Sequence, residues 1–255
     1  MVKTWNIIFP ASGHRERRRR AYVYLPVMYK TEPRRRFPVL YMFDGHNVFF
    51  DEHATHGRSW RLAEYLDCME VPLIVAAVEC SHKAPSGRIC EYSPWCFDDP
   101  DMGHIEASGK KTMEWFVHGF KSRIDKRYRT IPWREHTFIG GSSMGGLMSL
   151  YAVTRWNHIF SRAAALSPHL WADREALLRL IRTAPLMPDT VVYMDWGSEE
   201  VNCGMAHDMH RTASALLDRN VAVTARVVPG GDHSEASWER QAPFFIETLM
   251  YGISV

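Results

Sequence analysis

Short apolar runs alternate with stretches of helical periodicity along most of the chain. The apolar, β-prone runs predict strands at 4–9, 20–25, 37–43, 73–78, 136–139, 162–166, 190–196 and 222–228. Apolar positions at helical spacing predict helices at 59–69, from 112 past 124, and at 147–153, 173–182, 205–217 and 241–251. Two edge strands followed by alternating strands and helices predict an α/β fold with a mostly parallel, doubly wound sheet of about eight strands.

Three details of this pattern are specific enough to test. Ser59 and Thr112 stand where N-caps of two helices are expected. Phe244, Phe245 and Leu249 are predicted to face the core from the last helix. The segment 80–109 has Pro, Gly and aromatic residues without periodicity, so we interpret it as a long loop of functional interest.

Composition adds few constraints. The chain has 255 residues, 46% of them hydrophobic, and shows no repeat or linker, so we expect one domain over 1–255 without a separate cap domain. A net charge of +2 gives no electrostatic case for a nucleic-acid or membrane partner. Five cysteines without CxxC spacing favour free thiols in a reducing compartment, and residues 1–30 show no signal-peptide core. We therefore expect a soluble, cytoplasmic protein, and a homo-oligomer stays open.

One stretch, 138–147, carries a specific chemical signal. Gly141, Ser143 and Gly145 spell GxSxG between a predicted strand and a predicted helix. In a nucleophile elbow the serine occupies a strained turn, and its flanking residues are small because strand and helix approach each other there. The pentapeptide alone is also compatible with a flexible glycine-rich loop, but its context favours Ser143 as a nucleophile.

A nucleophilic serine needs an imidazole to accept its proton and a carboxylate to orient that imidazole. In α/β hydrolases the order along the chain is serine, acid, histidine, with the last two on loops after later strands. Among thirteen histidines, His233 follows the last predicted strand and a Pro-Gly-Gly turn, and Glu200 follows the preceding strand. Glu199 and Asp195 remain alternatives for the acid, although Asp195 lies within a predicted strand.

Backbone amides are expected to stabilise the negative oxygen of the reaction. One comes from the residue after the nucleophile, Met144, at the start of a helix, and the other from the loop after an earlier strand. Asp44 to Asn47 form such a loop, and we favour the amide of His46. The side chain of His46 is then free to face substrate or solvent.

Together these motifs resemble the esterase D-like group of α/β hydrolases in the "Putative esterase" family, with S-formylglutathione hydrolases, feruloyl, acetylxylan and enterochelin esterases, and mycolyl transferases. The resemblance extends along nearly the whole chain, at 23–26, 37–41, 91–95, 124–128, 141–147, 197–200 and 231–234. It implies an α/β-hydrolase fold and a cofactor-independent serine esterase with a triad of Ser143, Glu200 and His233. The family pattern also implies that the residue after Asp44-Gly45, His46, supplies an oxyanion amide. Many relatives have aspartate where this chain has Glu200, which keeps Glu199 open.

The substrate is less well defined by the sequence. Trp171, Trp196 and Trp238 lie near the ends of predicted strands and Trp95 lies in the long segment, so their rings are candidates for stacking on a substrate, although core packing fits them equally. His53, His56, His207 and His210 have metal-like spacings but no third ligand, so we expect no metal and no cofactor. We expect a small-molecule ester as substrate, with an acyltransferase or a catalytically dead binding protein as alternatives.

Overall fold

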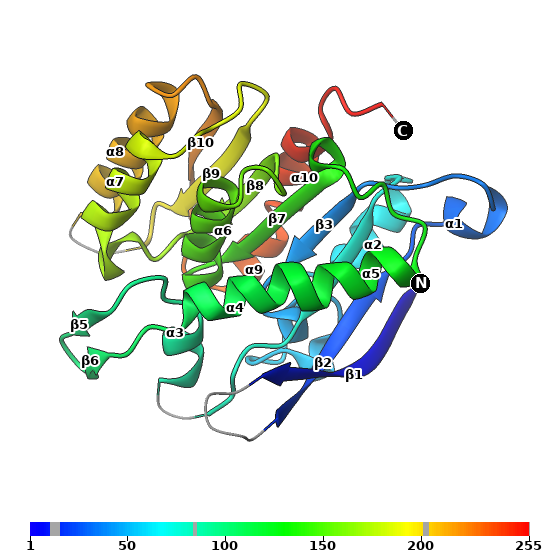
Figure 1. Ribbon diagram of the computed structural model, residues 1–255, viewed down its shortest axis with the longest axis horizontal. Helices are drawn as coiled ribbons and strands as arrows, with labels where there is room; N and C mark the ends of the chain where they lie inside the picture. Colours follow the sequence, from blue (N-terminus) through cyan, green and yellow to red (C-terminus); the bar gives the residue numbers. More distant parts are fainter. Residues whose placement is uncertain (11–15, 84–85, 201–203, 255) are drawn as a thin grey trace.

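The computed structural model describes residues 1–10, 16–83, 86–200 and 204–254. Its central sheet has eight strands in the order β1-β2-β4-β3-β7-β8-β9-β10 (Figure 1). The strands are β1 (Val2–Pro10), β2 (Glu16–Tyr24), β3 (Val39–Met42), β4 (Ile74–Val78), β7 (Thr137–Ser142), β8 (Arg162–Leu166), β9 (Val191–Gly197) and β10 (Ala222–Val228). β1 and β2 pair antiparallel at one edge, whereas all neighbours from β4 to β10 pair in parallel. The predicted α/β fold with a mostly parallel sheet is confirmed.

Helices cover both faces of this sheet (Figure 1). One face packs against α2 (Leu62–Cys68), α9 (Glu235–Glu239) and α10 (Ala242–Met250). The other packs against α4 (Gly109–Trp115), the π-helical η3 (Phe116–Lys121), α5 (Ser122–Arg127), α6 (Met144–Arg155), α7 (Arg174–Thr183) and α8 (Met205–Leu217). Short helical turns are α1 (Met28–Thr31), α3 (Gly87–Glu91), η1 (Gly45–Asn47), η2 (Asp51–His53), η4 (Arg134–His136) and η5 (Leu170–Ala172). No helix of the described residues combines the length and apolar character needed to cross a membrane.

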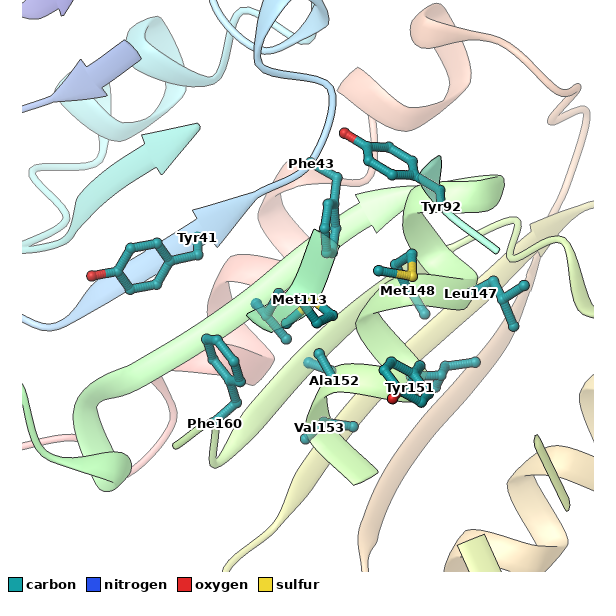
Figure 2. Close-up of a cluster of buried hydrophobic side chains, with 14 of the residues drawn as sticks. Tyr41, Phe43, Tyr92, Met113, Leu147, Met148, Tyr151, Ala152, Val153 and Phe160 are labelled. Atoms are coloured by element: carbon teal, nitrogen blue, oxygen red, sulfur yellow. The ribbon is translucent and has the colours of Figure 1, made fainter. Parts of the chain in front are cut away.

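Strand β3 shows why its sequence is apolar throughout. All four of its residues are buried, and successive side chains point to opposite faces of the sheet. Val39 and Tyr41 belong to the hydrophobic cluster under α6, and Leu40 and Met42 to the cluster under α10. Figure 2 shows Tyr41 within the first cluster, together with Met148 and other residues of α6. A central strand covered on both faces needs no polar side.

The predicted N-cap at Ser59 is wrong. Helix α2 begins at Leu62, and its N-cap is Arg61, in a left-handed conformation with φ of 45°. The N–H and hydroxyl of Ser59 both donate to Oδ1 of Asp51, at 2.8 and 2.9 Å. Local hydrogen bonding of this kind competes with helix capping, so the Ser59 side chain binds Asp51 instead of capping α2.

Three other expectations need correction. The segment 80–109 is not a plain loop, because it contains α3 and a small hairpin of β5 (Phe97–Asp99) and β6 (Gly103–Ile105), elements too short to show a period. Thr112 does not cap α4, which begins three residues earlier, at Gly109. Phe244 is 44% exposed rather than inward-facing, and the guanidinium of Arg226 lies over its ring at 3.6 Å. Phe245 and Leu249 are buried as predicted.

The topology gathers the candidate site at one edge of the sheet. His46 follows β3, Ser143 follows β7, Glu200 follows β9 and His233 follows β10. These four strands run in parallel, so their carboxyl ends share an edge, where α/β proteins bind their ligands.

Candidate active site

Ser143 occupies a strained turn between β7 and α6. Its φ of 56° and ψ of −121° lie outside the regions that non-glycine residues normally adopt. Its N–H donates to the carbonyl oxygen of Leu166 at 2.9 Å, and its own carbonyl accepts from the N–H of His169 at 3.0 Å. These backbone hydrogen bonds on both sides hold the serine at the apex of the turn.

The flanking glycines are required by close contact between strand and helix. A Cβ on Gly141 would lie 3.0 Å from the carbonyl carbon of Gly145. A Cβ on Gly145 would lie 3.1 Å from Cβ of Phe43 and 3.2 Å from Oδ2 of Asp44. The strand–turn–helix geometry expected of a nucleophile elbow is therefore present at 141–145.

Glu200 and His233 meet above the sheet edge. Oε2 of Glu200 lies 2.9 Å from Nδ1 of His233, and the Glu200 side chain is 1% exposed. Burial opposes ionisation of this carboxyl group, but hydrogen bonds from His233, Ser167 and the N–H of Gly197 outweigh it and lower the pKa of Glu200. A carboxylate can only accept, so Nδ1 carries the proton and Nε2 is the free basic nitrogen.

The two alternative acids do not contact His233 in the described residues. Glu199 has an exposed side chain. Asp195 is 1% exposed and accepts a hydrogen bond from the hydroxyl of Tyr193 at 2.6 Å. Burial raises the pKa of Asp195 to about 7, against the opposing hydrogen bond from Tyr193. Of the three candidates, Glu200 alone is placed to orient His233.

Ser167, which was not predicted from the sequence, contacts the Glu200 side chain of this pair. It follows β8 with a positive φ of 42°, and its hydroxyl donates to Oε1 of Glu200. The hydroxyl oxygen of Ser167 accepts from Nε1 of Trp238 at 3.0 Å, and the Trp238 ring lies edge-on to His233 with ring centres 5.0 Å apart. The only available signal was its position directly after a strand beside the elbow.

Ser143 and His233 line one cleft of about 300 Å³. Its walls also include His46, Asn47, Arg88 and Trp238. Among the described residues no hydrogen bond joins the Ser143 hydroxyl to His233. The structure thus places Ser143 and His233 at the same cleft. The basic nitrogen of His233, Nε2, is not the one that binds Glu200.

The backbone N–H groups of two buried residues at this edge are unpaired within the described residues. Neither Met144, 1% exposed, nor His46, 4% exposed, has a hydrogen-bond acceptor for its N–H within the described residues. Buried N–H groups without a partner are rare in folded proteins. The His46 side chain does not face bulk solvent, since it is buried and its Nε2 lies 3.1 Å from the Thr55 hydroxyl, but the residue does line the cleft.

Comparison with known proteins matches the chain to a family. The family model described as "Putative esterase" aligns with residues 12–252. The chain belongs to this family. It is 26% identical over 196 residues to "Uncharacterized protein YbbA" of Bacillus subtilis (strain 168), covering 74% of this chain and 72% of that protein.

Solved structures show the same fold. An IroE-like serine hydrolase from Shewanella oneidensis superposes with a TM-score of 0.76 at 17% identity, over 99% of this chain and 82% of the other. An S-formylglutathione hydrolase from Agrobacterium tumefaciens has a TM-score of 0.65 at 17% identity, over 98% and 95%. Family and fold identify the protein as a carboxylic ester hydrolase of the α/β-hydrolase fold.

In this esterase, an ion pair between the buried Asp44 and the Arg88 side chain, which is 30% exposed, secures the loop after β3. Asp44 is 4% exposed and has a left-handed φ of 53°. Nε and Nη2 of Arg88 donate to its two carboxylate oxygens at 2.8 and 2.7 Å, and Nη2 also donates to the carbonyl of Ser142 at 3.3 Å. Burial opposes ionisation of Asp44, but the charge and hydrogen bonds of Arg88 prevail and lower its pKa. Arg88 therefore connects α3 to the His46 loop and to the elbow.

We expect Arg88→Met to lower the free energy of unfolding at neutral pH. The loss should be about 3 kcal/mol, because it leaves the Asp44 charge buried without its partner. In the wild type, folding lowers the pKa of Asp44. Ionised Asp44 therefore stabilises the folded protein fully above about pH 4, the ordinary pKa of an aspartate side chain. This contribution is lost as the pH falls through the pKa of Asp44 in the folded state. In Arg88→Met, burial without the charge of Arg88 raises the pKa of Asp44. The loss of unfolding free energy relative to the wild type should therefore become smaller as the pH falls and Asp44 takes up a proton.

Urea unfolding at neutral pH and at about pH 4.5 tests this expectation. Arg58→Met is the matched control, because Arg58 pairs with Glu239 at the surface and its side chain is 52% exposed. Little change is expected for that control. If Arg88→Met destabilised the protein as little as Arg58→Met, or equally at both pH values, the role assigned to the pair of Arg88 with Asp44 would be contradicted.

The four candidate tryptophans of the esterase lie at different places in the structure. Trp238 lines the cleft. Trp95 lines another cavity beside Tyr151, and Trp171 lines a third. Trp196 is 6% exposed and packs on His210 with ring centres 5.6 Å apart. Trp238 is therefore the one of the four that lines the same cleft as Ser143 and His233.

Proposed function

We propose that this esterase acts through an acyl-enzyme formed on Ser143. The observation that carries the proposal is the 2.9 Å hydrogen bond between Glu200 and His233 at the cleft that also contains the strained Ser143. Nε2 of His233 accepts the Ser143 proton as Oγ attacks the ester carbonyl, and the Glu200 carboxylate stabilises the resulting imidazolium. His233 then gives this proton to the leaving alcohol.

The N–H groups of Met144 and His46 bind the carbonyl oxygen as it becomes negative. Both are buried and lack an acceptor, and Met144 begins a helix of 12 residues whose dipole favours negative charge. Water next attacks the acyl-enzyme with His233 as base, and collapse of the second intermediate releases the acid and restores Ser143.

The proposed substrate is a small soluble ester with a short acyl group. A cleft of about 300 Å³ stands at the lower end of small-molecule sites, and its walls carry mostly polar side chains beside Trp238. The net charge of +2 gives no reason to expect a nucleic-acid or membrane partner. With an added alcohol such as methanol, we expect the free acid rather than a new ester as the main product.

A fluorophosphonate probe tests the nucleophile directly. It reacts with activated serines, so we expect one equivalent of label, located on Ser143 by peptide mass spectrometry. Protein unfolded in urea before the probe is added should remain unlabelled, since unfolding separates Ser143 from His233. Absence of label from the folded protein, or label on a different serine, would remove the proposed mechanism.

A further inference from the structure

Three potential metal ligands gather on the wall of the cleft. The ligand atoms of His46, Cys80 and His82 lie within 4.8 Å of one another, and all three residues line the cleft that contains Ser143. His46 follows β3, and Cys80 and His82 follow β4, its parallel neighbour in the sheet. The histidines singled out by their sequence spacing are not in this group, because the sheet rather than a local motif brings the ligands together.

The hydrogen bonds of His46 leave one ring nitrogen available. The Thr55 hydroxyl donates its single proton to Oδ1 of Asn47 at 3.2 Å. It can therefore only accept from Nε2 of His46, 3.1 Å away, so Nε2 carries the ring proton. Nδ1 then holds a lone pair, and this buried nitrogen has no hydrogen-bond partner in the structure. A protonated ring nitrogen held by a neighbouring oxygen is the usual arrangement of a metal-binding histidine.

The other two side chains complete a mixed nitrogen and sulfur set. Cys80 is 2% exposed, whereas His82 is exposed at the mouth of the cleft. The rings of His46 and His82 lie edge to face with centres 4.9 Å apart. Burial and the Asp44 carboxylate raise the pKa of the Cys80 thiol, so a bound cation must displace its proton into solvent.

We propose that His46, Cys80 and His82 bind a divalent cation of the zinc type, and that the bound cation inhibits the esterase. Two imidazoles and a thiolate suit Zn²⁺ rather than Mg²⁺ or Ca²⁺, and they leave a fourth position for water. Inhibition follows because the cation and its water would share a cleft of about 300 Å³ with the substrate. It would also restrain His46, whose N–H belongs to the proposed oxyanion hole. The inhibitory part rests on the proposed function, whereas the binding part does not.

Cobalt(II) is the probe for binding, because coordination by a thiolate gives it a charge-transfer band in the near ultraviolet. The titration uses protein carrying Cys96→Ser, which removes the second, exposed group of Cys96, His104 and Glu106. We expect the band in this background and also after Ser143→Ala. Adding Cys80→Ser should abolish it, and His82→Ala should weaken cobalt binding at least tenfold. His56→Ala is the matched control, since His56 lines the same cleft outside the group.

Zn²⁺ inhibition of p-nitrophenyl acetate hydrolysis is the second readout, with each variant normalised to its own zinc-free rate. His82→Ala should need at least about tenfold more Zn²⁺ for half-inhibition, and His56→Ala the wild-type concentration. No cobalt band, a band that survives Cys80→Ser, or equal zinc sensitivity of the wild type and His82→Ala would overturn the proposal. If the zinc-free protein hydrolyses no ester, the proposed function and its inhibition fail together, while the cobalt spectrum still decides whether the cation binds.

Discussion

Replacement of Ser143 by alanine is expected to lower kcat for p-nitrophenyl acetate by about 10⁶-fold. Without Oγ, His233 has no nucleophile to deprotonate and no acyl-enzyme forms. The unpaired N–H groups of Met144 and His46 remain, so a small rate above that of uncatalysed hydrolysis should persist. Release of p-nitrophenolate, followed by absorbance over a range of substrate concentrations, gives kcat and KM separately.

The Ser143→Ala protein used for kinetics has to be shown to be folded like the wild type. Circular dichroism and the urea midpoint of Ser143→Ala should match the wild type closely, because one hydroxyl is lost and the backbone bonds to Leu166 and His169 remain. Ser214→Ala, at an exposed position of α8, is the matched serine control and should stay within about twofold of wild-type kcat. Hydrolysis that survives Ser143→Ala at a comparable rate would mean that another group is the nucleophile.

Replacement of Glu200 by glutamine should reduce kcat by about 10⁴-fold while the fold is retained. Oε1 of Glu200 accepts from the Ser167 hydroxyl and from the Gly197 N–H, so the amide oxygen of glutamine must take this place. Its NH₂ group then faces Nδ1 of His233, which has to accept instead of donate. The ring proton moves to Nε2, the nitrogen that should receive the proton of Ser143, so the histidine is held in the wrong tautomer.

Glu199→Gln is the control for this substitution, because it makes the same chemical change one residue away on an exposed side chain. We expect its kcat to stay close to that of the wild type. The reverse result, with a large loss in Glu199→Gln and little in Glu200→Gln, would assign the acid to Glu199 and leave the serine mechanism in place. Equal and small losses in both variants would argue that no carboxylate orients His233.

The sequence predicts best those features in which adjacent residues carry the information. The strands at 162–166 and 222–228 have the predicted bounds, and the elbow at 141–145 has the predicted turn, since apolar runs and glycines act locally. The coincidence of Glu200 and His233 after successive strands also placed them correctly at one sheet edge. Their catalytic roles, like that of Ser143, stay predictions that the variants above test.

Features that depend on contacts distant in sequence were not predictable. Arg88 lies 44 positions from Asp44, in a segment whose short helix shows no period. Ser167 acts through a glutamate 33 positions away. Even Ser59, a good capping residue, was misassigned because Asp51 competes for its hydrogen bonds. In each case the tertiary partner, rather than the intrinsic preference of the residue, decides the outcome.

The ion pair of Arg88 with Asp44 limits how this esterase can be engineered. The segment 80–109 borders the cleft at Cys80, Ser81, His82 and Arg88, so it is an obvious stretch to exchange when a new substrate range is wanted. The same segment supplies the guanidinium of Arg88, which neutralises Asp44 and donates to the carbonyl of Ser142, the residue before the proposed nucleophile. A loop graft that omits this arginine would change catalysis and substrate range together. Exchanges that begin after Arg88, or that keep an arginine there, should allow the two properties to be varied separately.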